Sequence, residues 1–153
     1  MRSLENRIPP LVTFALMGAA MWAVTRVVAA ASFSLPAART LAAVLGLAGF
    51  AIAALGVISF RRAKTTVNPL QPGAASALVV SGIYRLTRNP MYLGLLLVLV
   101  GWGLFLGHAI AVALSVTYVP LMNRLQIQSE ERALAAKFGP EFAAYRAHVR
   151  RWL

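Results

Sequence analysis

The stretch PMYLGLLLVLVGWGLFLGHAIAVALSVTYVPLM, residues 90–122, decides the fold of this chain. It contains no Asp, Glu, Lys or Arg, and Gly107 and His108 divide it into two apolar halves. A transmembrane helix takes roughly 20 apolar residues to cross about 30 Å of hydrocarbon. Each half is somewhat shorter than this. We therefore expect a tight hairpin of two membrane helices, 90–106 and 109–122, and their length leaves open whether both cross the whole bilayer.

Two longer apolar stretches precede the hairpin, residues 10–31 and 37–60. Each is long enough to span a bilayer. The first follows two arginines and ends in three alanines, as a secretory signal does, but it is too long for a typical signal and a second span follows at once. We expect it to be retained. The sequence thus predicts an all-α integral membrane bundle, one domain over 1–153, with about four transmembrane helices and C-terminal interfacial helices.

The composition supports this reading. Hydrophobic residues make up 59% of the chain, charged residues only 12%, and the mean hydropathy is +0.71. A soluble domain of about 150 residues still exposes roughly a third of its unfolded surface, so it has too little interior for this apolar content. The chain has no Cys, which excludes disulfides, thiolate metal sites and a Cys nucleophile. We expect no metal, because His108 and His148 stand alone as interfacial residues.

The charge is strongly basic, with 15 Lys and Arg against 4 Asp and Glu. Such an excess can indicate nucleic acid, but the apolar bulk favours membrane lipids and a lipophilic small-molecule or lipidated substrate as partners. Short cytoplasmic segments retain Lys and Arg. We therefore expect cytoplasmic N and C termini, in a bacterial inner membrane. The basic residues on that side are Arg2, Arg7, Arg61, Arg62, Lys64, Arg85, Arg88, Arg124, Arg132, Lys137, Arg146, Arg150 and Arg151.

The cytoplasmic loop 61–89 ends in a predicted helix start. Asn89 is a residue type that caps free backbone N–H groups, and Pro90 suits the first helical position. An anion placed there would meet backbone donors and a guanidinium, from Arg85 or Arg88, at the positive end of the helix dipole. The plainer interpretation, a capped span with basic flanks, explains the same residues.

The second polar segment, 123–153, predicts two amphipathic helices at the membrane interface. Ile127, Leu134 and Phe138 fall on one helical stripe. Gly139 is expected to end the first helix and the following proline to begin another. Both helices have basic residues available for lipid headgroups.

Glu130 and Glu131 are two of the four acids in the chain, and they are adjacent. Neither has Lys or Arg three or four residues away, so pairing along the helix does not explain them. A partly buried carboxylate needs a cationic or hydrogen-bonding partner. That partner is either Arg88 or Arg85, or a ligand that carries positive charge and hydroxyl groups.

Two ordered sets of residues carry a resemblance to a known family. The first set is Gly82, Tyr84, Arg88, Asn89, Pro90, Tyr92 and Gly94; the second is Glu130, Glu131, Arg132, Phe138, Gly139, Tyr145, Arg150 and Trp152. Each set alone is weak, but both in this order, separated by one short helical hairpin, are specific. From about residue 61 to 153 the chain resembles the isoprenylcysteine carboxyl methyltransferase and phospholipid methyltransferase superfamily of integral membrane enzymes.

The resemblance implies an S-adenosyl-L-methionine site at the cytoplasmic face. It implies Arg88 and Glu131 as catalytic residues, and substrate contacts at Asn68, Tyr145 and Arg146. The implied cofactor-binding residues are Tyr84, Arg88, Asn89, Pro90, Tyr92, Gly94, Glu130 and Glu131. Many family members have His where this chain has Asn89, and Asn cannot act as a base near neutral pH.

The function expected on this basis is S-adenosylmethionine-dependent methyl transfer to a lipophilic substrate, as in isoprenylcysteine carboxyl methyltransferases. A phosphatidylethanolamine-type phospholipid and a small thiol are alternative acceptors. Two other classes stay open, a sterol-type membrane reductase that uses NADPH and a membrane scaffold without enzymatic activity. Gly101 and Gly103 are interpreted as sites of close helix packing.

Overall fold

The computed structural model describes residues 8–64 and 76–153. Asn68, a predicted substrate residue, lies outside these ranges. The elements in chain order are α1 (Pro10–Val27), η2 (Ala29–Ala31), α2 (Ala38–Arg62), η4 (Gly82–Arg85), α3 (Pro90–Phe105), α4 (Ala109–Met122), η5 (Asn123–Ile127) and α5 (Gln128–His148). The described residues form no β-sheet, so the all-α prediction is confirmed.

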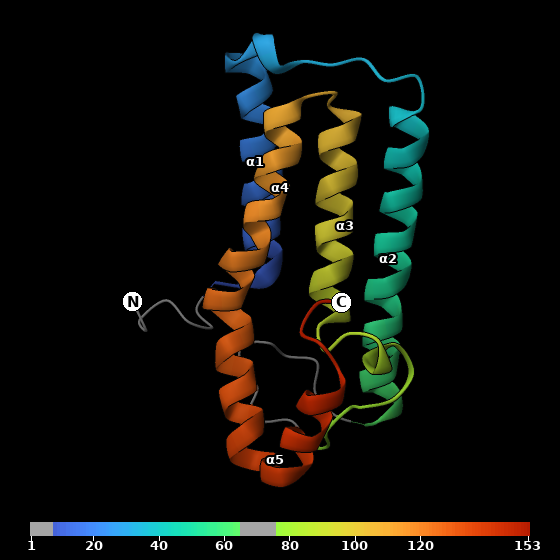
Figure 1. Cartoon of the computed structure of the whole chain (residues 1–153), viewed down its shortest axis with the longest axis vertical. Coiled ribbons are helices and arrows are strands. Elements are labelled where there is room, and N and C mark those ends of the chain that lie inside the picture. Colours follow the sequence, from blue (N-terminus) through green and yellow to red (C-terminus); the bar gives the residue numbers. More distant parts are fainter. Residues whose placement is uncertain (1–7, 65–75) are drawn as a thin grey trace.

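Four helices, α1 to α4, run roughly parallel to one axis, with α3 between α2 and α4 (Figure 1). Among the described residues, three helical stretches are long and apolar enough to cross a membrane: Pro10–Val27, Ala38–Arg62 and the continuous Ala109–His148. Helix α3 is apolar but has only 16 residues, a length of about 24 Å at 1.5 Å per residue. The first span was predicted to reach residue 31. It ends at Val27 instead, and a separate 3₁₀ turn follows.

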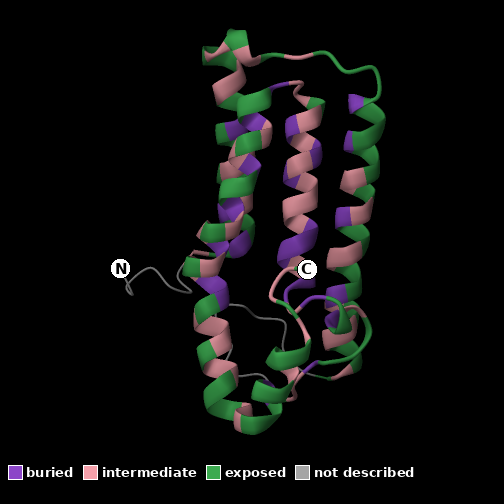
Figure 2. Cartoon of the chain, in the orientation of Figure 1, coloured by how far each residue is buried: buried purple, intermediate pink, exposed green. Residues whose placement is uncertain are grey.

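The outer faces of these helices are apolar. Leu16, Leu47, Phe50 and Val116 each expose more than 60% of their surface, and exposed residues lie along the outside of the bundle (Figure 2). In water so many exposed large apolar side chains would be unfavourable, whereas lipid tails accept them at no cost. The protein is a membrane protein.

Small residues let α3 approach its neighbours closely. A Cβ on Gly101 would lie 2.9 Å from the Ala42 carbonyl oxygen of α2, and one on Gly103 would lie 2.9 Å from the Cα of Val112 in α4. Glycine is therefore needed where these backbones meet, as in other membrane helix pairs. The structure confirms the packing interpretation of both residues.

His108 lies at the end of the bundle where α3 turns into α4. Its side chain is fully buried, Nε2 lies 2.6 Å from the Val28 carbonyl oxygen, and Nδ1 accepts a hydrogen bond from the Ala111 backbone. His108 caps α4 and ties the hairpin to the end of α1.

At the opposite end, the chain leaves the bundle along α4. A π-helical turn, η5, joins α4 to α5, whose first half continues beyond the bundle (Figure 1). Gly139 has φ 45° and ψ −117°, a left-handed conformation that favours glycine, and the helix turns back there as predicted. Residues 149–153, which we call the C-terminal tail, return to the base of α3.

Candidate functional site

A cavity of about 80 Å³ lies where the end of α2, η4, the start of α3 and both halves of α5 meet. Its polar lining comes from Tyr84, Arg88, Asn89, Tyr92, Glu130, Glu131 and Tyr145, and its apolar lining from Phe60, Leu78, Val79, Met91, Leu134 and Phe142. This is smaller than the roughly 300–1,000 Å³ of pockets that enclose whole small molecules. At this volume the cavity encloses only part of a ligand the size of a nucleoside.

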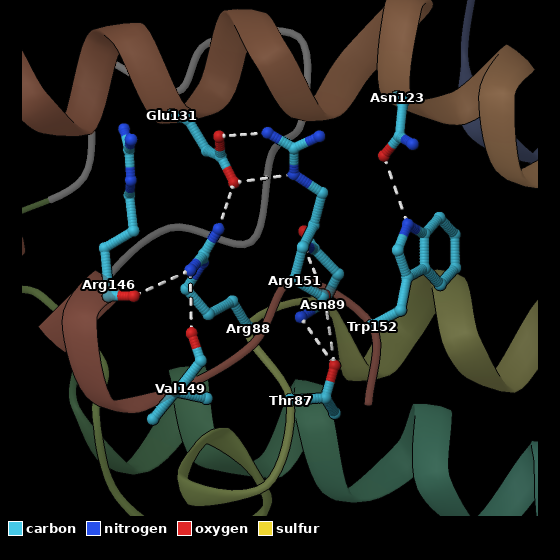
Figure 3. A network of polar contacts seen from close by, with 9 residues as sticks. All are labelled: Thr87, Arg88, Asn89, Asn123, Glu131, Arg146, Val149, Arg151 and Trp152. Atoms are coloured by element: carbon cyan, nitrogen blue, oxygen red, sulfur yellow. Dashed lines mark hydrogen bonds and ion pairs between the residues drawn. The ribbon is translucent and has the colours of Figure 1, made fainter.

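Glu131 sits at the centre of an ion network (Figure 3). Its Oε1 accepts hydrogen bonds from Arg88 Nη2 at 2.7 Å and from Arg151 Nε at 3.0 Å, and its Oε2 accepts one from Arg151 Nη2 at 2.7 Å. Burial alone would raise the pKa of Glu131, but the hydrogen bonds and charges of the two arginines outweigh it and hold the pKa below its usual value. Glu131 is an ionised carboxylate, and both of its oxygens are occupied.

The C-terminal tail holds Arg88 from the other side. Arg88 Nη1 donates to the carbonyl oxygens of Val149 at 2.7 Å and Arg146 at 3.2 Å, and the Arg88 backbone N–H donates to the Arg150 carbonyl at 3.0 Å. The side chain of Arg88 is only 10% exposed. Its Nε is buried without a hydrogen-bond partner among the described residues, so one donor of this guanidinium remains unused.

The tail also accepts hydrogen bonds from the side chains of the residues on either side of Arg88. Thr87 Oγ1 donates to the Arg151 carbonyl at 3.2 Å, and Asn89 Nδ2 donates to the same oxygen at 2.9 Å. Trp152 Nε1 donates to Asn123 Oδ1 at 3.1 Å. These bonds fasten the last residues of the chain to the start of α3 and to η5.

The prediction that the Asn89 side chain caps α3 is wrong. Asn89 occupies the N-cap position and Pro90 the first helical position, but the Asn89 side chain accepts no capping hydrogen bond. Its amide instead donates a hydrogen bond to the Arg151 carbonyl of the tail, which also accepts one from Thr87. The Asn89 backbone carbonyl still accepts the first helical bond, from Leu93.

Glu130 differs from its neighbour in having no cationic partner among the described ion pairs. Its Oε1 accepts a short hydrogen bond from the Tyr92 hydroxyl. Burial raises the pKa of Glu130 to about 7, the Tyr92 hydrogen bond acts against this, and the charge of Glu131 adds to it. A partly buried carboxylate with a pKa near neutrality has capacity to spare for a cation or a proton.

Aromatic side chains form the remaining wall. The rings of Phe60 and Tyr84 meet edge to face with their centroids 5.4 Å apart, and the Tyr145 hydroxyl donates to the Tyr84 carbonyl at 2.7 Å. Burial raises the pKa of Tyr145 to about 12, and burial with the nearby Tyr145 and Glu130 raises the pKa of Tyr84 further still. Both hydroxyls therefore remain protonated donors at neutral pH.

Most of the predicted site residues meet in this cavity, but not all. Tyr84, Arg88, Asn89, Tyr92, Glu130, Glu131 and Tyr145 line it. Pro90 and Gly94 pack against α2 instead, where a Cβ on Gly94 would clash with the Gly49 carbonyl. Arg146 contributes its backbone carbonyl to Arg88, and its side chain is exposed. Of the two proposed cationic partners for the Glu pair, Arg88 is observed and Arg85 is exposed.

Two parts of the site are not among the residues predicted from the sequence. Arg151 was counted only as a basic flank, and four apolar lining residues, Phe60, Leu78, Val79 and Met91, were not considered. Two adjacent carboxylates without local basic partners indicate that distant cations pair with them. No spacing along the chain identifies Arg151 as one of these cations. In the part of the chain that the structure describes, no group of three or more His, Asp or Glu could hold a metal.

Two comparisons with known proteins give matches. Residues 37–141 match the family model of phospholipid methyltransferases. An uncharacterized protein of Haemophilus influenzae is 44% identical over 63 residues, which are 41% of this chain and all of that protein. No solved structure matches the chain.

Proposed function

The chain belongs to the phospholipid methyltransferase family, whose members are membrane methyltransferases, and on this premise we propose that it transfers a methyl group from S-adenosylmethionine to a lipophilic acceptor. One observation carries the proposal. The cavity combines a partly buried carboxylate, Glu130, that pairs with no cation among the described residues, with a nearly buried guanidinium that has an unused donor, Arg88. Groups of both signs, each with hydrogen-bonding capacity to spare, suit a zwitterionic ligand.

The donor set fits S-adenosylmethionine chemically. Its ammonium and sulfonium groups require carboxylate, its own carboxylate requires a cationic donor, and its adenine requires aromatic or apolar walls. Glu130 would face the positive groups, Arg88 Nε the carboxylate, and Phe60, Tyr84 and Phe142 the adenine. When bound, the cofactor supplies an electrophilic methyl group for direct displacement.

The residues of this chain contribute alignment and a dry, preorganised field. Tyr92 fixes the orientation of Glu130, and the tail fixes Arg88, so neither group must reorganise when charge moves. If the acceptor is a carboxylate or a thiolate, no general base is required. If it is an amine, the amine must lose a proton, and Glu130 or Glu131 would accept it. Glu130 is better suited because its pKa is about 7 and its oxygens are less occupied.

The site lies at the end of the spans, beside apolar surface, so the acceptor would reach it from the bilayer. Met91 of α3 and Leu134 of α5 form an apolar side of the cavity. We propose that this end of the bundle faces the cytoplasm of a bacterial cell, because the basic residues gather there. An isoprenylcysteine carboxylate, an aminophospholipid and a small thiol are the acceptor classes to compare.

Calorimetric titration of the detergent-purified protein with S-adenosylhomocysteine tests the proposal. We expect saturable binding, weakened at least about tenfold by Glu130→Gln, since a charge-assisted contact contributes about 1.5–3 kcal/mol. Glu141→Gln is the matched control, because Glu141 is an exposed acid on the same helix. Absence of heat at millimolar ligand contradicts the proposal. Binding of NADPH in its place would assign the cavity to the reductase class.

A further inference from the structure

The C-terminal tail is short, but most of its residues make polar contacts with the cavity wall or with η5. In five residues it supplies three backbone carbonyls, those of Val149, Arg150 and Arg151, to Thr87, Arg88 and Asn89. It also supplies the Arg151 guanidinium to Glu131 and the Trp152 indole to η5. The tail itself lies beyond the segment 37–141 that matches the family model, whereas its partners lie within that segment.

The two adjacent acids, Glu130 and Glu131, differ in their hydrogen-bond partners. Both oxygens of Glu131 accept hydrogen bonds from arginines, and two of the three bonds come from Arg151. Glu131 therefore has little capacity left for a ligand. Among the described residues, Glu130 accepts one hydrogen bond, from Tyr92, and pairs with no arginine. The carboxylate available to a ligand, Glu130, and the carboxylate that binds the arginines of the cavity wall, Glu131, are therefore different residues.

We propose that the C-terminal tail is part of the ligand site and that Arg151 is a positioning residue for Glu131 and Arg88. Arg151 holds Glu131, and Glu131 together with the tail carbonyls holds Arg88 in the cavity wall. Glu130 is left as the carboxylate that faces the ligand. This inference rests on the proposed function, because it states how the same site is kept ready for S-adenosylmethionine.

The Arg151 contact has the shape of a guanidinium fork. Nε and Nη2 donate to the two oxygens of one carboxylate, at 3.0 and 2.7 Å. Lysine has the same charge but cannot make this paired contact. Replacement of Arg151 by lysine therefore separates the geometry of the contact from its charge.

The experiment compares the wild type with Arg151→Ala, Arg151→Lys and Arg124→Ala. Arg124 is exposed, so its replacement removes one positive charge from the same end of the molecule without touching the network. S-adenosylhomocysteine binding is measured with and without millimolar guanidinium chloride. Emission of Trp152, taken as the difference from a Trp152→Phe partner of each variant, reports independently whether the tail is docked.

We expect Arg151→Ala to weaken binding about tenfold or more, Arg151→Lys to fall in between, and Arg124→Ala to bind as the wild type does. Added guanidinium should restore binding in Arg151→Ala alone, because it refills the vacated place, whereas a general loss of stability would worsen with this salt. Wild-type affinity in Arg151→Ala, or weakened binding without rescue, overturns the positioning role. If the wild type itself fails to bind, the proposed function falls and the inference with it, even where Trp152 shows a docked tail.

Discussion

Replacement of Glu131 by Gln tests the ion network most sharply. The change keeps the shape of the side chain but removes its charge, so Arg88 and Arg151 lose their common counter-ion. Loss of one partner of a buried ion pair costs about 3–5 kcal/mol, and loss of an exposed one about 0–1 kcal/mol. The Arg88 side chain is 10% exposed and that of Arg151 33%, so the first half of the network is nearly buried and the second is partly screened. Because Gln retains one acceptor oxygen, we expect a net loss of about 2–3 kcal/mol.

The assay is reversible unfolding in mixed micelles at several pH values. The pKa of folded Glu131 lies below the ordinary value of 4.5. Its contribution to stability is therefore fully present above pH 4.5 and is lost as the pH falls through the folded-state pKa. Glu131→Gln should lower the free energy of unfolding above pH 4.5 and remove this acid-dependent part, while Glu141→Gln should change neither. A variant as stable as the wild type at pH 7 would refute the reasoning.

Three further predictions concern Glu130, α3 and the far end of the bundle. The pKa of folded Glu130 is about 7, against an ordinary value of 4.5. The free energy of unfolding should therefore fall as the pH rises from 4.5 through 7. Glu130→Gln should flatten this slope when unfolding is measured at several pH values. Gly94→Ala should destabilise the protein by about 1–3 kcal/mol in the same assay, because its Cβ meets the Gly49 carbonyl, whereas Gly18→Ala, with open space around it, should not. His108→Ala should cost about 1–3 kcal/mol because it removes a partner of the Val28 carbonyl and of the Ala111 N–H, and an unchanged unfolding midpoint would argue against this capping role.

The spans could be predicted because the bilayer imposes a length and an apolar composition on any helix that crosses it. The predicted stretches 37–60 and 90–106 accordingly end within two residues of α2 (Ala38–Arg62) and α3 (Pro90–Phe105). The helix break at Gly139 was likewise readable, since a glycine followed by proline ends a helix by local chemistry. The end of the first span was not readable, because the residues that follow Val27 are apolar but form a 3₁₀ turn held by His108 from a distant part of the chain.

The site was predictable in its acids and in one cationic partner, Arg88, but not in the second, Arg151. Scarcity made Glu130 and Glu131 stand out, and their lack of neighbouring bases showed that something distant must satisfy them. Local rules then failed at Asn89, where a capping residue gave its side chain to the Arg151 carbonyl 62 residues away. The backbone carbonyls that fix Arg88 carry no residue-specific signal at all, so the return of the tail is a property of the folded chain alone.

Transfer of a labelled methyl group tests the central claim most directly. The purified protein, reconstituted with a membrane lipid extract, is supplied with S-adenosylmethionine labelled in its methyl group, and the lipid fraction is analysed for label. We predict incorporation into a lipophilic acceptor by the wild type and by Glu141→Gln, and strongly reduced incorporation by Glu130→Gln. Incorporation that is absent from the wild type, or equal in the wild type and Glu130→Gln, would contradict the account.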